Sequence, residues 1–134
     1  MAEEVDIIEK TVQDSTVNRN ELLASALREY LALMERGSYF EAHEVLEDAW
    51  HPLRKSGNPL KNLLKGLING AIAFEHLKRN RRGAARKACK VMNAFERYKY
   101  LVREADEAEA LLQAACHKVE QLKEEKQNTF NLFV

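Results

Sequence analysis

The sequence predicts an all-α fold, a compact antiparallel helical bundle of four to five helices. Apolar residues recur at helical spacing along most of the 134 residues, and no stretch of useful length alternates like a β-strand. The predicted helices are also joined by short turns, which place consecutive helices side by side in opposite directions. A hydrophobic content of 46% agrees with a folded core and argues against disorder.

The sequence divides the chain into three parts. Residues 1–18 form an N-terminal arm or a short helix, because their few apolar residues are compatible with either. The helical core domain covers residues 19–102. Residues 103–134 form a C-terminal helix and an apolar tail, which pack on the core or on a second subunit.

Helix start and stop signals divide the core domain further. The first helix is expected over about 19–36 and ends near Gly37, a favourable residue just past a helix C-terminus. Ser38 is then a natural N-cap, and Glu41 completes a capping box for the second helix. The later helices are expected over about 39–53, 59–79, 83–101 and 103–126.

Four residues in or next to the middle helices lead to further predictions. Pro52 fits the end of the second helix, because proline disfavours a helical backbone at the residue before it. Gly66 and Gly70 share one side of the third helix, which indicates that a neighbouring helix approaches closely there. Asn80 is expected either to end the third helix with a left-handed backbone or to cap the fourth.

The overall charge and the termini argue against several classes of protein. Lys plus Arg and Asp plus Glu balance at 21 each, so long-range attraction to nucleic acid or an anionic membrane is not favoured. Residues 1–4 include two acids and no apolar signal region follows, and no apolar run approaches the ~20 residues of a membrane span. Cys89 and Cys116 lack metal-ligand spacing and are expected to be reduced thiols. The prediction is a cytoplasmic protein without a membrane partner.

Residues 39–50 are the most unusual stretch of the sequence. In a helix, they place an ordinary apolar stripe beside a second line made by His43, Glu47 and Trp50 at positions i, i+4 and i+7. Phe40 and Glu44 lie at the far edge of that line. A face that mixes imidazole, carboxylate and aromatic groups is typical of a half-buried seam against a neighbouring helix.

Two interpretations of this seam stay open, and the first is structural. His43 and Glu47 pair with each other at the edge of a core that Trp50 anchors. The protein is then a non-catalytic binding or scaffolding module with a His/Glu/Trp polar network. The absence of a nucleophile elbow, a nucleotide-binding glycine loop and a Cys–His pair in one motif favours this interpretation.

The second interpretation is a metal-dependent or small-molecule-binding enzyme. His43, Glu47 and His76 are the candidate ligands of a divalent metal, since His and carboxylate at i, i+4 can share an ion. Glu44 is the candidate general base, and the neighbouring aromatic residues are candidate pocket walls. Because the His–Glu spacing is common on surface helices, whether the chain is an enzyme stays open.

A basic turn follows the third helix. Arg79, Arg81 and Arg82 are candidate contacts to a phosphate or a nucleic acid, and Arg86 and Lys87 extend the patch. No glycine-rich phosphate loop accompanies them, and cations near a helix C-terminus are favourable in any protein. With a net charge of zero, nucleic acid is the disfavoured partner, and a homodimer or another protein is preferred.

Two runs of the sequence resemble the signatures of the domain-of-unknown-function 309 family, which occurs in small all-helical bacterial and archaeal proteins. The first run is residues 39–50, and the second is 65–76 followed by 80–84. Asn69 stands where the family more often has Gln, and Arg79 where it more often has Gly. The resemblance implies a compact helical domain and no particular activity.

The resemblance further implies that the second and third helices pack together. His43, Glu44 and Glu47 would then lie near Asn69 or His76, so these two residues join the candidate polar network.

Overall fold

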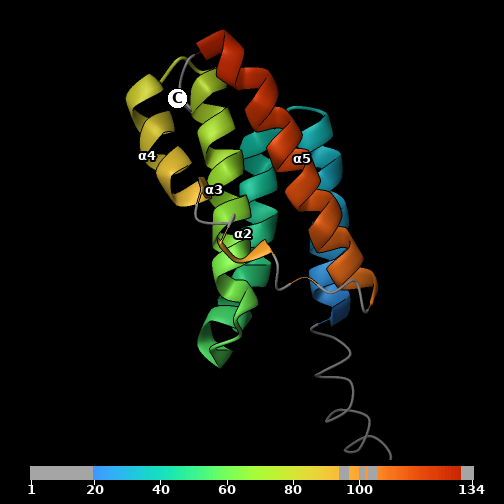
Figure 1. Ribbon diagram of the computed structural model, residues 1–134. Helices are drawn as coiled ribbons and strands as arrows, with labels where there is room; N and C mark the ends of the chain where they lie inside the picture. The colour runs from blue at the N-terminus through green and yellow to red at the C-terminus, as the bar shows by residue number, and fades with distance from the viewer. Residues whose placement is uncertain (1–19, 94–96, 100–101, 103–105, 131–134) are drawn as a thin grey trace, which may run out of the picture.

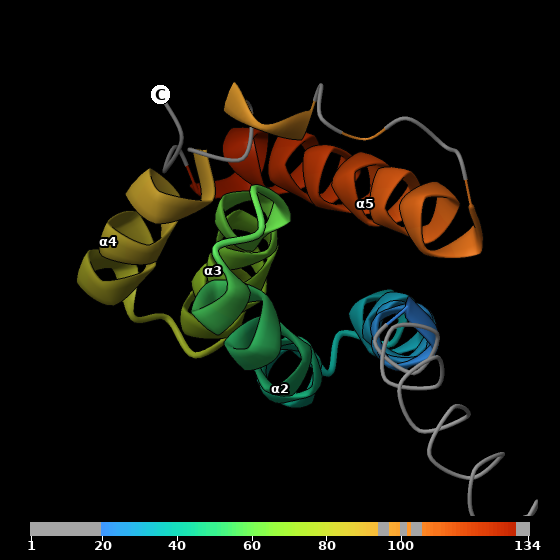
Figure 2. The ribbon, with the colours of Figure 1, turned by 90° about the horizontal axis from the view of Figure 1, so that it is seen from below.

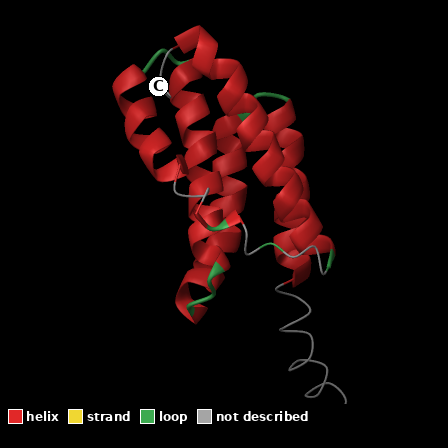
Figure 3. Cartoon of the chain, in the orientation of Figure 1, coloured by secondary structure: helices red, strands yellow, loops and turns green. Residues whose placement is uncertain are grey.

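The computed structural model describes residues 20–93, 97–99, 102 and 106–130, with side chains through residue 126. Within these residues the chain is helical and has no strand, so the predicted all-α fold is confirmed (Figures 1 and 3). The N-terminal arm and the end of the apolar tail lie outside the described residues. The described helices are residues 20–35, α2 (Tyr39–Ser56), α3 (Leu60–Lys78), α4 (Arg82–Met92) and α5 (Glu107–Phe130).

A residue with a left-handed backbone conformation follows each of the first three helices and forms part of the short turn to the next helix. Gly37 (φ 76°) and Gly57 (φ 73°) adopt this conformation without the steric cost of a Cβ, and Asn80 (φ 60°) adopts it after α3. The N–H of Ser38 donates to the carbonyl of Leu33 at 2.8 Å, which closes the turn after the first helix. The predicted stop at Gly37 is confirmed, and Asn80 takes the left-handed one of its two predicted roles.

The second helix departs from two predictions. The Ser38 side chain makes no capping hydrogen bond, because its backbone (φ −85°, ψ 63°) is not in the extended conformation that an N-cap needs, and the predicted capping box with Glu41 is wrong. Pro52 lies inside α2, which continues to Ser56. Proline removes its own N–H and crowds the carbonyl one turn earlier, but Pro52 is exposed, so water can satisfy that carbonyl.

The fourth and fifth helices also differ from their predicted bounds. α4 ends at Met92, several residues early, because Tyr98 and Val102 pack back onto the core instead of extending the helix. α5 begins directly after Asp106, whose Oδ1 accepts a hydrogen bond from the N–H of Glu109 at 2.9 Å. An aspartate at this position satisfies one of the unpaired N–H groups of the first turn.

α2 and α3 form an antiparallel pair, as the short linker between them predicts. The rings of Tyr39 and Phe74 lie 5.6 Å apart at one end of the pair, and Trp50 reaches Lys61 at the other. α3 lies at the centre of the bundle and packs against α2, α4 and α5 (Figures 1 and 2).

α5 packs over helix 20–35 and runs parallel to it. Arg28 pairs with Glu107 and Glu35 pairs with Lys118, so the partners advance in the same direction along both helices. Consecutive helices are therefore antiparallel as far as α4. α5 begins at the end of the bundle where helix 20–35 begins, and so it runs in the same direction as that helix (Figure 1).

The core lies where helix 20–35, α3 and α5 meet. Tyr30 is fully buried, and its hydroxyl donates to the carbonyl of Leu67 at 2.8 Å. Gly70 is buried within α3, and a Cβ built there would lie 3.4 Å from Sδ of Met92 and from Cγ1 of Val119. The predicted close approach of neighbouring helices is therefore confirmed at Gly70. Among the described residues, the other large, fully buried side chains are Leu27, Met34, Leu46, Leu63, Leu64, Leu67, Phe74, Met92, Leu112 and Val119.

Two further sequence predictions concern the cysteines and the membrane. Cys89 and Cys116 are buried thiols. Burial raises the pKa of the Cys89 thiol, and nearby Lys123 and a hydrogen bond from Asn93 oppose that rise only in part. In the described residues, no helix combines the length and the apolar composition that a membrane span needs.

Candidate functional site

The polar line of α2 lies along a half-buried seam with α3. The side chain of His43 is 16% exposed and that of Glu47 is 45% exposed. Trp50 is partly buried and packs against the core. The helix positions these three side chains together because residues four and seven apart return to the same face. They therefore line the boundary between the two helices.

The histidine pocket, a cavity of about 370 Å³, lies at the end of this seam beside the turn between α3 and α4. α2 and α3 supply its two sides, and the turn supplies its cationic end. Its lining residues are Phe40, His43, Ile72, Glu75, His76, Arg79 and Arg81.

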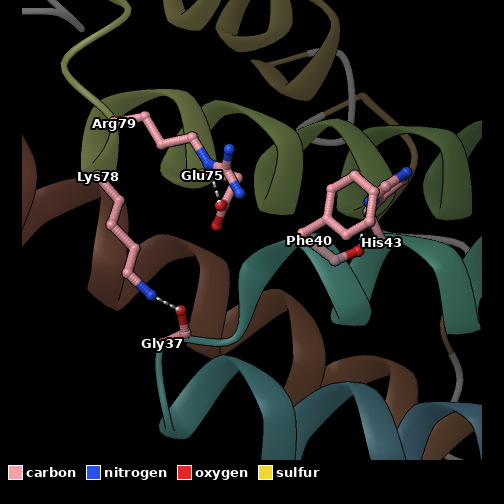
Figure 4. A network of polar contacts seen from close by, with 6 residues as sticks. All are labelled: Gly37, Phe40, His43, Glu75, Lys78 and Arg79. Atoms are coloured by element: carbon pink, nitrogen blue, oxygen red, sulfur yellow. Dashed lines mark hydrogen bonds and ion pairs between the residues drawn. The ribbon is translucent and has the colours of Figure 1, made fainter.

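The imidazole of His43 is held by its own helix (Figure 4). Its Nδ1 contacts the backbone carbonyl of Phe40, which can only accept a hydrogen bond, so Nδ1 carries the proton. The Phe40 ring meets the imidazole edge-on, with centroids 4.9 Å apart. Nε2 lies 3.7 Å from Oε2 of Glu47, beyond direct hydrogen-bond distance. This arrangement leaves Nε2 of His43 available to a ligand or to Glu47.

His76 contributes the second imidazole of the histidine pocket. Its Nδ1 is buried and has no hydrogen-bond partner in the described part of the chain. A buried N–H without an acceptor costs about 1–3 kcal/mol, whereas an unpaired lone pair is tolerated better. The ring therefore favours the tautomer with its proton on Nε2.

The end of α3 and the turn after it carry several cationic side chains, some of which have a partner while another is available to a ligand. Nε of Arg79 donates to Oε1 of Glu75 at 2.7 Å, so each neutralises the other (Figure 4). Nζ of Lys78 donates to the carbonyl of Gly37 at 3.0 Å and ties this turn to the one before α2. Arg81 is exposed and makes no ion pair with any described residue. Arg81 is thus the cation of the lining that remains available to a bound anion.

A smaller pocket of about 190 Å³ lies next along the seam and shares Ile72 with the histidine pocket. Glu47, Trp50 and Asn69 are among its lining residues. The indole N–H of Trp50 and the side-chain amide of Asn69 each donate to a backbone carbonyl of α3 at 2.9 Å. The structure therefore divides the predicted cluster, with both histidines in one pocket and the tryptophan and asparagine in the other.

The predicted metal ligands are divided in the same way. Among the residues that the structure describes, no group of three or more His, Cys, Asp or Glu side chains is arranged to hold a metal ion. Glu47 lines the smaller pocket, whereas His43 and His76 line the histidine pocket. The His43–Glu47–His76 metal site stays a prediction without geometric support, and metal analysis of protein purified without a chelator tests it. Glu44, the predicted base, is exposed and lines neither pocket.

Two residues of the histidine pocket, Ile72 and Glu75, are not among the site residues predicted from the sequence. Glu75 stands four residues before Arg79, a spacing that signals an ion pair on a helix and that could have identified it. Ile72 lies one turn before His76 and so shares its face. Arg82, which the sequence groups with Arg79 and Arg81, begins α4 outside the pocket lining.

Of three comparisons with known proteins, one gives a match. Residues 27–88 match the model of a family described as a domain of unknown function (DUF309). This range extends from helix 20–35 into α4 and includes every lining residue of both pockets in the seam. A comparison with the curated proteins and one with the solved structures each found no match.

Proposed function

Since residues 27–88 of this chain match the DUF309 family, as the two signature runs predict, and the description of that family names no activity, we propose a function from the site itself. The protein is a non-catalytic binding module whose histidine pocket takes a small anionic molecule with a flat apolar part. One observation carries the proposal. Arg81, which no described residue pairs, stands beside the imidazoles of His43 and His76 at a cavity of about 370 Å³.

The charges of the lining favour an anion. Glu75 and Arg79 neutralise each other, so Arg81 leaves the lining with one net positive charge when both imidazoles are neutral. A guanidinium binds a carboxylate or phosphate through two parallel N–H groups, which makes arginine well suited to this role. Phe40 and Ile72 supply apolar walls for the rest of the ligand.

The composition of the lining supports binding without covalent catalysis. The lining holds no Ser, Thr, Cys or Lys that could act as a nucleophile. Glu44 lies outside the pocket, and the single lining carboxylate, Glu75, is held by Arg79. Binding therefore accounts for the polar groups without requiring a reaction.

Phenyl phosphate is a suitable probe because it joins a phosphate to one aromatic ring. Titrated into ¹⁵N-labelled protein, it is expected to shift the resonances of His43, His76 and Arg81. A second groove, of about 240 Å³ between helix 20–35 and α2, is lined by apolar residues with Glu29 and Asp48 and has no Lys or Arg. That apolar groove is expected not to respond to an anion.

Matched arginine variants separate the pocket from general charge effects. Arg81→Gln is expected to weaken phenyl phosphate binding by at least about tenfold, because losing a hydrogen bond to a charged group costs about 1.5–3 kcal/mol. The control is Arg54→Gln, whose guanidinium lies 5.2 Å from the centroid of the Trp50 ring, outside the histidine pocket. Equal losses in both variants, or shifts confined to the apolar groove, would refute the proposal.

The homodimer expected from the sequence stays a prediction. One reason for it was the C-terminal helix, and α5 packs on the core of its own chain through Leu112, Ala115 and Val119. The other reason was the apolar tail, whose side chains lie outside the described residues. Light scattering on the full chain tests the prediction, and a monomer mass at every concentration would remove it.

A further inference from the structure

Positive charge is concentrated in one segment of this neutral chain. Residues 76–93 contain seven Lys or Arg and no Asp or Glu. The other residues then hold 14 cations against 21 carboxylates, so the protein is strongly polarised despite a net charge of zero. Such an uneven distribution creates a local field that the net charge conceals.

The structure places most of this charge on one outward face. α4 is an outer helix of the bundle that packs on α3, and its apolar side buries Ala85, Ala88, Cys89 and Met92 (Figures 1 and 2). The opposite side is exposed and carries the α4 cationic face, which comprises Arg82, Arg86, Lys87 and Lys90.

The α4 cationic face lacks compensation within the described structure. None of its four cations makes an ion pair with a described residue, whereas Arg28, Arg79 and Lys118 each pair with a glutamate. Like charges at i, i+4 destabilise a helix by about 0.2–0.5 kcal/mol per pair, and a cation in the first turn, such as Arg82, opposes the helix dipole. The sequence thus retains a self-repelling arrangement that an anionic partner would relieve.

We propose that the α4 cationic face binds the phosphate backbone of a nucleic acid. Arg82, Arg86 and Lys90 rise about 6 Å from one to the next and form a row about 12 Å long. Phosphates of one strand advance about 3.4 Å along a duplex axis, so the row spans three to four of them. All three side chains are Arg or Lys, which bind phosphate oxygens, so the proposed contact is to the backbone.

The packing of α4 distinguishes nucleic acid from a membrane surface as the partner. A helix that lies in a membrane interface inserts an apolar face among the lipids. The apolar face of α4 is already buried against the bundle, and its exposed side contains charged residues and Gly83. This surface lies outside the histidine pocket and makes an interaction beyond the proposed small-molecule site.

Fluorescence anisotropy with labelled RNA and DNA duplexes tests this inference. The wild-type chain is expected to bind both at about 50 mM salt, with an affinity that falls steeply as salt rises. The triple variant Arg82→Gln, Arg86→Gln, Lys90→Gln is expected to bind at least about tenfold more weakly. Its slope of log affinity against log salt is expected to be shallower by about 2–3, at about 0.9 for each lost phosphate contact.

A matched triple variant controls for the loss of net charge. Arg36→Gln, Lys55→Gln, Lys65→Gln removes three exposed cations from other parts of the surface and is expected to keep most of the affinity. If the α4 triple variant melts below wild type, the single variant Arg86→Gln replaces it, with an expected slope change of about 0.9. Three results would overturn the inference: no binding by wild type, equal losses in both triple variants, or tighter binding to phosphatidylserine vesicles than to either duplex.

Discussion

The indole Nε1 of Trp50 donates a hydrogen bond to the backbone carbonyl of Lys61 at 2.9 Å, which fastens the second half of α2 to the first turn of α3. Trp50→Phe keeps an aromatic ring but removes the N–H donor. We expect the free energy of unfolding to fall by about 1–2 kcal/mol, from the lost hydrogen bond and the smaller ring. Urea unfolding measures this change. It is followed by circular dichroism and not by tryptophan fluorescence, because the variant lacks the only tryptophan of the chain.

A neighbouring ring provides the control for that variant. His51 is exposed and its ring centroid lies 5.3 Å from that of Trp50. His51→Gln is expected to change stability by less than about 0.5 kcal/mol. If Trp50→Phe is as stable as wild type, the bond to Lys61 contributes nothing to the pairing of α2 with α3.

Tyr30 predicts how stability changes at alkaline pH. Burial, followed by the neighbouring Cys116, raises the pKa of Tyr30 well above its usual value of about 10. The folded chain then keeps the phenolic proton while the unfolded chain loses it, so the stability contribution is complete below about pH 10 and declines as pH rises further. We expect wild type to lose up to about 1.4 kcal/mol per pH unit from this group.

Tyr30→Phe isolates this contribution. The variant lacks the bond to the carbonyl of Leu67, so it is expected to be about 1 kcal/mol less stable at neutral pH. The difference between wild type and variant should shrink, and then reverse, above about pH 10. A difference that stays constant up to pH 12 in thermal melts would contradict the buried tyrosine.

The close packing around Gly70 limits the size of the side chain that this position of α3 can hold. A Cβ there meets Met92 and Val119 at 3.4 Å, so the branched side chain in Gly70→Val has no room. We expect a loss of about 1–3 kcal/mol in the free energy of unfolding from overpacking. In the control Gly83→Ala, nothing lies within 4 Å of the added methyl, and a gain of up to about 1 kcal/mol is expected. Equal outcomes for the two variants would disprove the close approach.

The ion pairs between helix 20–35 and α5 are expected to contribute little to stability. The side chains of Arg28 and Glu107 are 49% and 71% exposed, so water and salt screen their attraction. A double-mutant cycle with Arg28→Ala and Glu107→Ala should give a coupling energy below about 1 kcal/mol that decreases with added salt. A coupling above about 2 kcal/mol would mean that the pair is desolvated in solution.

Local signals in the sequence were sufficient to predict most of the helices. Apolar spacing and the residues Gly37 and Asn80 located the first turns, because a left-handed backbone depends on the residue that adopts it. The continuation of α2 through Pro52 was not predictable in this way, since the local rule that proline disfavours a helical backbone at the preceding residue predicts an end there. The parallel course of α5 depends on contacts between residues far apart in sequence, which periodicity cannot reveal.

Most residues of the candidate site were predicted from the sequence, but only part of their arrangement in space was. Helical spacing correctly placed His43 beside Glu47 on one face of α2. It could not tell that the two residues line different pockets, because that depends on the side chains that α3 contributes to the seam, among them Ile72, which lines both pockets. The sequence also could not show that Arg81 is the arginine available to a ligand. That follows from the pairing of Arg79 with Glu75, which is seen only in the folded chain.

The parallel docking of α5 has a consequence for the nascent chain. Its contacts with helix 20–35 join residues 79 and 83 positions apart. At about 5–20 residues per second, translation delivers those partners several seconds after helix 20–35 has left the ribosome. The hairpin of α2 and α3 assembles from near neighbours and forms early, whereas helix 20–35 waits with one apolar side uncovered. We expect the nascent chain to be most prone to aggregation during that interval.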